Sequence, residues 1–87
     1  MNFYNFKKLT EREIIILAEV LRGKTNSEIA QKFFITLHTV KAHVKNILAK
    51  TDSRHRTELI SKIFAKNLNI DLINDDFADI IYQFFNN

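Results

Sequence analysis

The chain has 87 residues, of which 46% are hydrophobic and 26% are charged, and its formal net charge is +3. This length suits one domain, and the apolar content excludes a wholly disordered chain. The absence of cysteine excludes disulfides and thiolate metal sites, and no apolar run approaches the roughly 20 residues that cross a bilayer. The N-terminus lacks the layout of a signal peptide, so we expect a cytoplasmic protein of bacterial type with no membrane association.

Charge divides the chain into a basic body and an acidic end. Residues 1–66 hold all 13 lysines and arginines with six acidic residues, a net charge of +7, whereas residues 67–87 hold four aspartates and no base, a net charge of −4. A basic body indicates a polyanionic partner such as nucleic acid. We divide the chain into an N-terminal arm (1–8), a helical domain (9–67) and an acidic, apolar extension (68–87).

The first helix is predicted after the arm, whose three aromatic residues lack a period and are expected to pack at least one ring on the domain. Thr10 and Glu13 have the spacing of a capping box, and Leu9 with Ile14 that of a hydrophobic staple. The helix is apolar nearly all round, which favours a central place in the core. Gly23 is expected to end it in the left-handed conformation. Since proline is absent and this glycine is the only one, an all-α fold is favoured.

The second helix repeats the same capping signal with Thr25 and Glu28, or with Asn26 as the cap instead. Its predicted apolar side is formed by Ile29, Ala30, Phe33 and Phe34. A short break then leads to a third helix over residues 37–50, with Thr36 as its cap. Two helices joined by so short a turn are typical of a helix-turn-helix.

The third helix has three predicted faces. An apolar stripe for the core consists of Val40, Val44, Ile47 and Leu48. The opposite side holds His38, Lys41, Ala42 and Lys45, and one flank holds Thr39, His43, Asn46 and Lys50. A helix with this division suits a small domain that lays a basic face in a DNA groove, although an ordinary solvated surface helix has the same pattern.

A fourth helix is predicted to begin near residues 52–54, with Asp52 or Ser53 as its cap, and to run to about residue 67. Its apolar stripe is Leu59, Ile60, Ile63 and Phe64. A last helix is predicted over residues 75–85, where phenylalanines and isoleucines keep helical spacing and acidic residues occupy the first turn.

Residues 9–60 resemble the LuxR-type (GerE-like) helix-turn-helix DNA-binding domain. The resemblance rests on LTEREI, on the glycine before TNSEIA, on TVKAHVKNILAK and on Arg56-Thr57-Glu58, in the right order and spacing. It implies a four-helix domain with the third helix in the major groove, and the chain is expected to be a stand-alone member.

The resemblance also implies roles for individual residues. It implies that Lys41, Ala42 and Lys45 face the bases, and His38 lies on the same face of the third helix. Contacts to the DNA backbone, or structural supports, are implied for Thr25, Asn26, Thr39, His43, Lys50 and Arg56. Thr36 is a further expected backbone contact, because it lies beside the free amides at the N-terminus of the third helix. Dimerisation is implied through the fourth helix, at Leu59, Ile60 and Ile63.

The sequence departs from the family pattern at two places. Thr51, Asp52 and Ser53 stand where the family usually has leucine, glycine and an aliphatic residue, which predicts an altered junction between the third and fourth helices. Ile14 and Ile15 stand where the family is often charged, which predicts an unusually apolar outer side of the first helix.

The leading hypothesis is a sequence-specific transcription regulator that binds an inverted repeat in double-stranded DNA as a homodimer. No enzyme, metal or cofactor is expected, because no Ser/His/Asp arrangement or glycine-rich phosphate loop is present and the three histidines lack the spacing of a helical metal pair. The alternative is a protein-interaction module on the same scaffold, with the acidic extension masking the Lys41/Lys45 face or docking a partner. Region four of a sigma factor, which would bind RNA polymerase, and a nonspecific nucleoid protein are further alternatives.

Overall fold

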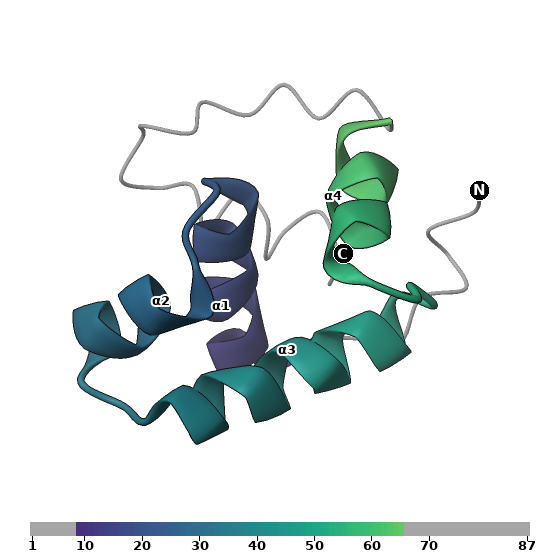
Figure 1. The fold of residues 1–87 in the computed structure, drawn as a ribbon. Coiled ribbons are helices and arrows are strands. Elements are labelled where there is room, and N and C mark those ends of the chain that lie inside the picture. Colours follow the sequence, from purple (N-terminus) through teal and green to yellow (C-terminus); the bar gives the residue numbers. More distant parts are fainter. Residues whose placement is uncertain (1–8, 66–87) are drawn as a thin grey trace.

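The structure is a computed structural model, and it describes residues 9–65 of the chain. Four helices follow one another: α1 (Glu11–Leu21), α2 (Asn26–Phe33), α3 (Leu37–Lys50) and α4 (Arg56–Phe64), and no strand occurs among the described residues. Figure 1 shows α3 running beneath α1 and α2, with α4 rising near its C-terminal end. The all-α fold is confirmed. The packing of the arm, the end of the fourth helix near residue 67 and the helix over 75–85 lie outside the described residues.

Local sequence signals set the starts of α1 and α2. Thr10 caps α1: its hydroxyl accepts from the Glu13 amide at 3.1 Å, and the Glu13 carboxylate accepts from the Thr10 amide at 2.8 Å. Thr25, rather than Asn26, caps α2 through the same reciprocal pair with Glu28. Because these caps satisfy amides that have no partner within the helix, both predicted capping boxes are confirmed.

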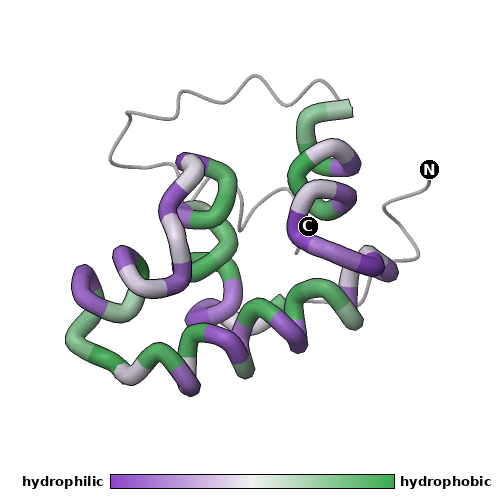
Figure 2. The backbone as a smooth tube through the Cα atoms, in the orientation of Figure 1, coloured by the Kyte–Doolittle hydropathy of each residue, from purple (hydrophilic) through white to green (hydrophobic). Residues whose placement is uncertain are grey.

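The core forms where the apolar stripes of the helices meet. Its members are Leu9, Ile14, Ile16, Leu17, Ala18, Val20, Leu21, Ile29, Ala30, Val40, Val44, Ile47, Leu59 and Ile63. Figure 2 shows hydrophobic and hydrophilic positions alternating along α3, which therefore turns one stripe inward and one outward. The prediction of an unusually apolar outer side of α1 is largely wrong, because of the two isoleucines behind it Ile14 is buried and only Ile15 is partly exposed.

The prediction that Phe34 belongs to the apolar side of the second helix is wrong. α2 ends at Phe33, and Phe34 adopts the left-handed conformation with φ at 55°. Its amide donates to the carbonyls of Ala30 and Gln31, which closes the helix, while its side chain is 95% exposed. A left-handed cap redirects the chain, so the helical spacing that predicted burial of Phe34 no longer applies.

We expect Phe34→Asn to stabilise the domain by about 0.5–1 kcal/mol, because asparagine tolerates the left-handed conformation and the exposed ring contributes little packing. In a domain of this size such a gain raises the unfolding temperature by a few degrees, which thermal unfolding followed by circular dichroism would detect. Phe34→Ala is the control, since alanine keeps the conformational strain. An asparagine variant that unfolds below the wild type would show that the ring stabilises the fold.

The junction between α3 and α4 differs from the prediction. α4 begins at Arg56, and His55 caps it by accepting from the Glu58 amide at 3.2 Å, so Asp52 and Ser53 are not the caps. Asp52 instead adopts φ of 53°, at the position where the resemblance leads one to expect glycine. Thr51 is buried, and its hydroxyl donates to the Ile47 carbonyl at 2.8 Å, which allows a polar residue to replace the usual leucine.

Candidate nucleic-acid interface

One face of α3 is open to solvent along its whole length. His38, Lys41, Ala42 and Lys45 are exposed, as predicted. On the opposite side Val40, Val44 and Ile47 are buried and Leu48 is partly buried. α3 contains no acidic residue, and the hydroxyl of Thr36 caps it by accepting from the Thr39 amide at 3.1 Å. The structure therefore brings together two lysines, a histidine and a small apolar side chain on one surface. We call these four residues the α3 face.

Ion pairs elsewhere leave this face with unbalanced positive charge. Five of the ten lysines and arginines in the described part of the chain pair with carboxylates: Lys50 with Glu13, Arg22 and Lys32 with Glu19, and Arg54 and Lys62 with Glu58. Within residues 9–65, no ion pair is formed by Lys41 or Lys45. Unpaired cations attract a polyanion more strongly than paired ones, so Lys41 and Lys45 place available positive charge on the α3 face.

Lys50 lies on the flank of α3 but is held by α1. Its ammonium donates to the Glu13 carboxylate at 2.7 Å. Burial of Glu13 opposes ionisation, but the hydrogen bonds from Lys50 and from the Thr10 backbone, with the positive charge of Lys50, together lower the pKa of this carboxyl below its ordinary value of 4.5. The pair joins the N-terminal end of α1 to the C-terminal end of α3. Lys50 thus has the role of a structural support that the resemblance allowed, with a partner that the sequence did not indicate.

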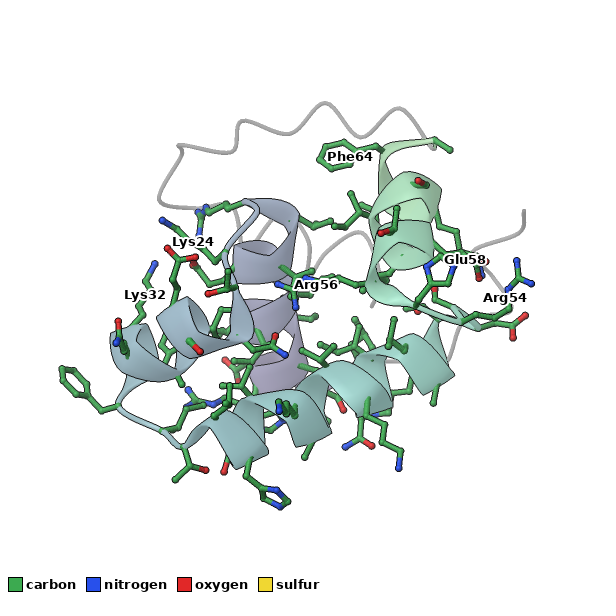
Figure 3. All side chains as sticks on the ribbon, viewed as in Figure 1. Lys24, Lys32, Arg54, Arg56, Glu58 and Phe64 are labelled. Atoms are coloured by element: carbon green, nitrogen blue, oxygen red, sulfur yellow. The ribbon has the colours of Figure 1, made fainter. Side chains whose placement is uncertain are left out.

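Arg56 joins the start of α4 to the start of α2. Its guanidinium donates to the Asn26 side-chain oxygen at 2.6 Å and to the Lys24 carbonyl, and Figure 3 shows it reaching across from α4. Burial lowers the pKa of Arg56, although an arginine remains charged at neutral pH. Because Thr25 caps the same helix, the structure gathers three predicted backbone contacts, Thr25, Asn26 and Arg56, near the N-terminus of α2.

Thr36, Thr39 and His43 lie along the N-terminal half of α3. The hydroxyls of Thr36 and Thr39 are 2.9 Å apart, and His43 is partly buried on the flank of the helix. Free amides at a helix N-terminus favour a phosphate, and threonine hydroxyls beside them are suitable additional donors. Thr39 and His43 are partly buried and thus lie on a flank of α3, between the α3 face and the core.

The junction below α4 holds a charged cluster that sequence reasoning missed. Glu58 accepts from the Arg54 backbone and side chain at 3.1 and 3.0 Å, which lowers its pKa to about 2, with Lys62 contributing. Figure 3 shows Arg54 and Glu58 side by side. Lys62 also donates to the carbonyls of Thr51 and Asp52, at the C-terminal end of α3. The i, i+4 spacing of Arg54, Glu58 and Lys62 was the available signal for this cluster.

The lowered pKa values predict loss of stability in acid. The pKa values of Glu13, Glu28 and Glu58 lie below the ordinary 4.5 in the folded protein. A lowered pKa in the folded state gives stability that is complete above about pH 4.5 and is lost as pH falls toward about 2.

We therefore expect the thermal midpoint to fall between about pH 5 and pH 3, with a smaller fall for Glu58→Gln, because that variant has no carboxylate to protonate at the junction. Calorimetry at the two pH values would measure this difference. Equal midpoints for the wild type at both pH values would contradict the prediction.

The predicted dimer residues are divided between the core and the surface. Leu59 and Ile63 are fully buried against the core of the same chain, whereas Ile60 is only partly buried. Phe64, which was not among the predicted dimer residues, is 40% exposed on the same helix. A contact through α4 with another molecule would therefore use Ile60 and Phe64. The described residues contain no group of three potential metal ligands, and none of their helices is long and apolar enough to span a membrane.

The short α2, a tight turn and the longer α3 with an exposed basic face form a helix-turn-helix unit. The family profile GerE, described as bacterial regulatory proteins of the luxR family, matches residues 7–63, and the chain belongs to this family.

Two kinds of relative illustrate the likeness. The chain is 50% identical over 52 residues to the transcriptional regulatory protein LiaR of Bacillus subtilis, a match that covers 60% of this chain and 25% of LiaR. It is 44% identical over 63 residues to the response regulator protein VraR of Staphylococcus aureus, covering 72% of this chain and 30% of VraR. The chain thus spans less than a third of the length of these relatives. No solved structure matches it.

Proposed function

We propose that this chain is a DNA-binding transcription regulator, not an enzyme, that reads a specific sequence by placing α3 in the major groove. The observation that carries the proposal is the α3 face, where Lys41 and Lys45 are exposed and form no ion pair within residues 9–65. Lysine can donate to guanine O6 and N7, and Ala42 can touch a thymine methyl group. The name of LiaR, a transcriptional regulatory protein, supports the same function.

Contacts to the phosphates position the domain on the duplex. We assign them to Thr36, Thr39 and His43 beside the α3 face, and to Thr25, Asn26 and Arg56 near the N-terminus of α2. Lys50 is held by Glu13 at 2.7 Å, so its assigned role is to support α3 and only secondarily to meet a phosphate. Contacts of this kind fix register and orientation, while the base edges supply sequence information.

Binding as a homodimer to an inverted repeat is the second part of the proposal. Partly exposed apolar residues on α4, Ile60 and Phe64, provide a surface through which two copies can meet. Two α3 helices would then enter major grooves about one helical turn apart. We also include in the proposal a contact with RNA polymerase, which suits a transcription regulator.

The test is selection of bound duplexes from a random DNA library at about 0.15 M salt, where binding through phosphates alone is weak. An enriched inverted repeat is the expected result. An enriched single half-site would support specific reading without the dimer. A folded protein that enriches no sequence would contradict the proposal and favour the alternative in which the acidic extension masks the α3 face.

A further inference from the structure

Leu37 is a large apolar side chain that neither the core nor a cap accounts for. Among the described residues three large hydrophobic residues are exposed: Phe34, Leu37 and Phe64. Phe34 is turned outward by the left-handed cap of α2, and Phe64 lies on α4. Leu37 alone belongs to α3, where it is the first helical residue and is 40% exposed. A ligand of α3 is therefore the natural partner of this side chain.

Leu37 lies one helical turn before Lys41, at the border between the α3 face and the buried stripe that includes Val44. Four residues along an α-helix correspond to a rotation of about 40° and a rise of about 6 Å, so the two side chains are neighbours along the axis. His38, the next residue, is exposed as well. In helix-turn-helix proteins the N-terminal residues of the second helix contact base edges. When Lys41 faces the bases, Leu37 thus lies one turn closer to the N-terminus, over an adjoining base pair.

We infer that Leu37 reads a thymine by packing its side chain against the C5-methyl group in the major groove. This inference rests on the proposed function. A leucine side chain carries no hydrogen-bond donor or acceptor, and the thymine methyl is the apolar group that a base pair presents in that groove. The base pair is an A·T pair that lies outside those contacted by Lys41 and Lys45, and it gives each half-site an apolar element of specificity.

The test replaces each thymine of the selected duplex, one at a time, with deoxyuridine, which lacks only the C5-methyl group. For the wild type we expect affinity to fall about three- to fivefold at one thymine in each half-site, besides any thymine that Ala42 contacts, as for the loss of one buried methyl group. Leu37→Ala is expected to bind the thymine duplex weaker by a similar factor and to be indifferent to deoxyuridine at that position. Leu37→Met, which keeps the apolar bulk, is expected to retain the discrimination.

Phe34→Asn is the matched control, because it removes a neighbouring exposed apolar side chain and leaves Leu37 in place, so its methyl discrimination is expected to equal that of the wild type. Circular dichroism of each variant checks folding. A wild type that selects a sequence but ignores every methyl group overturns the inference alone, whereas one that selects no sequence overturns the proposed function as well. A Leu37→Ala protein that keeps the methyl discrimination but fails to alter transcription would assign Leu37 to a protein contact and also overturn the inference.

Discussion

Lys41→Ala is expected to weaken binding to the selected duplex by about 1–3 kcal/mol, or roughly 5- to 150-fold, and to relax specificity at one base position. The loss is large because Lys41 is exposed and is not neutralised by an acidic residue within the described part of the chain. Its ammonium is therefore available for guanine O6 and N7. Fluorescence anisotropy with the selected duplex and its single-base variants would measure both effects, and Lys45→Ala should behave alike.

The matched control is Arg12→Gln, which removes one positive charge from α1, where the guanidinium lies 5.4 Å from the centroid of the Phe33 ring. It should change affinity much less than Lys41→Ala. A Lys41→Ala protein that loses the same factor on every sequence, with a salt slope reduced by about 1, would show that Lys41 contacts a phosphate and not a base.

Glu13→Ala is expected to destabilise the domain by about 2–4 kcal/mol, since it removes a buried carboxylate that both caps α1 and binds Lys50. Lys50→Met should be destabilising too, because it leaves that carboxylate without its ammonium partner while keeping an apolar stem. In the double variant the two effects should not add, and a coupling energy of about 1 kcal/mol or more is expected for residues in direct contact. Urea denaturation of the wild type, the two single variants and the double variant would complete this double-mutant cycle.

The same proteins separate the structural role of Lys50 from a role in DNA binding. If Lys50 acts through Glu13, the folded Lys50→Met protein should bind the selected duplex nearly as well as the wild type. If the stability effects of Glu13→Ala and Lys50→Met simply add, and if Lys50→Met lowers the affinity for DNA, Lys50 instead contacts the phosphate backbone.

The elements set by local sequence could be predicted. The capping boxes at Thr10 and Thr25 depend on residues three positions apart, and the structure has both. The buried stripe of α3 follows from helical periodicity alone, and so does the exposure of Lys41 and Lys45 on the opposite side. In these cases the signal and the structure that it specifies lie within one helix.

What could not be predicted depends on residues distant in the sequence or on unusual backbone. The partners Glu13 and Lys50 are 37 positions apart, and no local pattern pairs them. Phe34 and Asp52 take the left-handed conformation that favours glycine; a phenylalanine gives no signal of such a turn, and an aspartate gives only a weak one. The turn at Asp52 delays α4 to Arg56, which is why both its start and its cap were misplaced.

The distribution of ion pairs has a consequence for the speed of association. Because α3 contains no acidic residue and Lys41 and Lys45 form no ion pair within residues 9–65, the α3 face contributes a local positive field that points outward from the described domain. Such a field turns the molecule during its diffusional approach, so that many encounters with DNA begin with α3 already facing the duplex. The association rate constant should then decline steeply between low and physiological ionic strength, because the Debye length shortens to about 8 Å. The placement of unpaired lysines on α3, together with the net charge, thus contributes to how quickly a site is found.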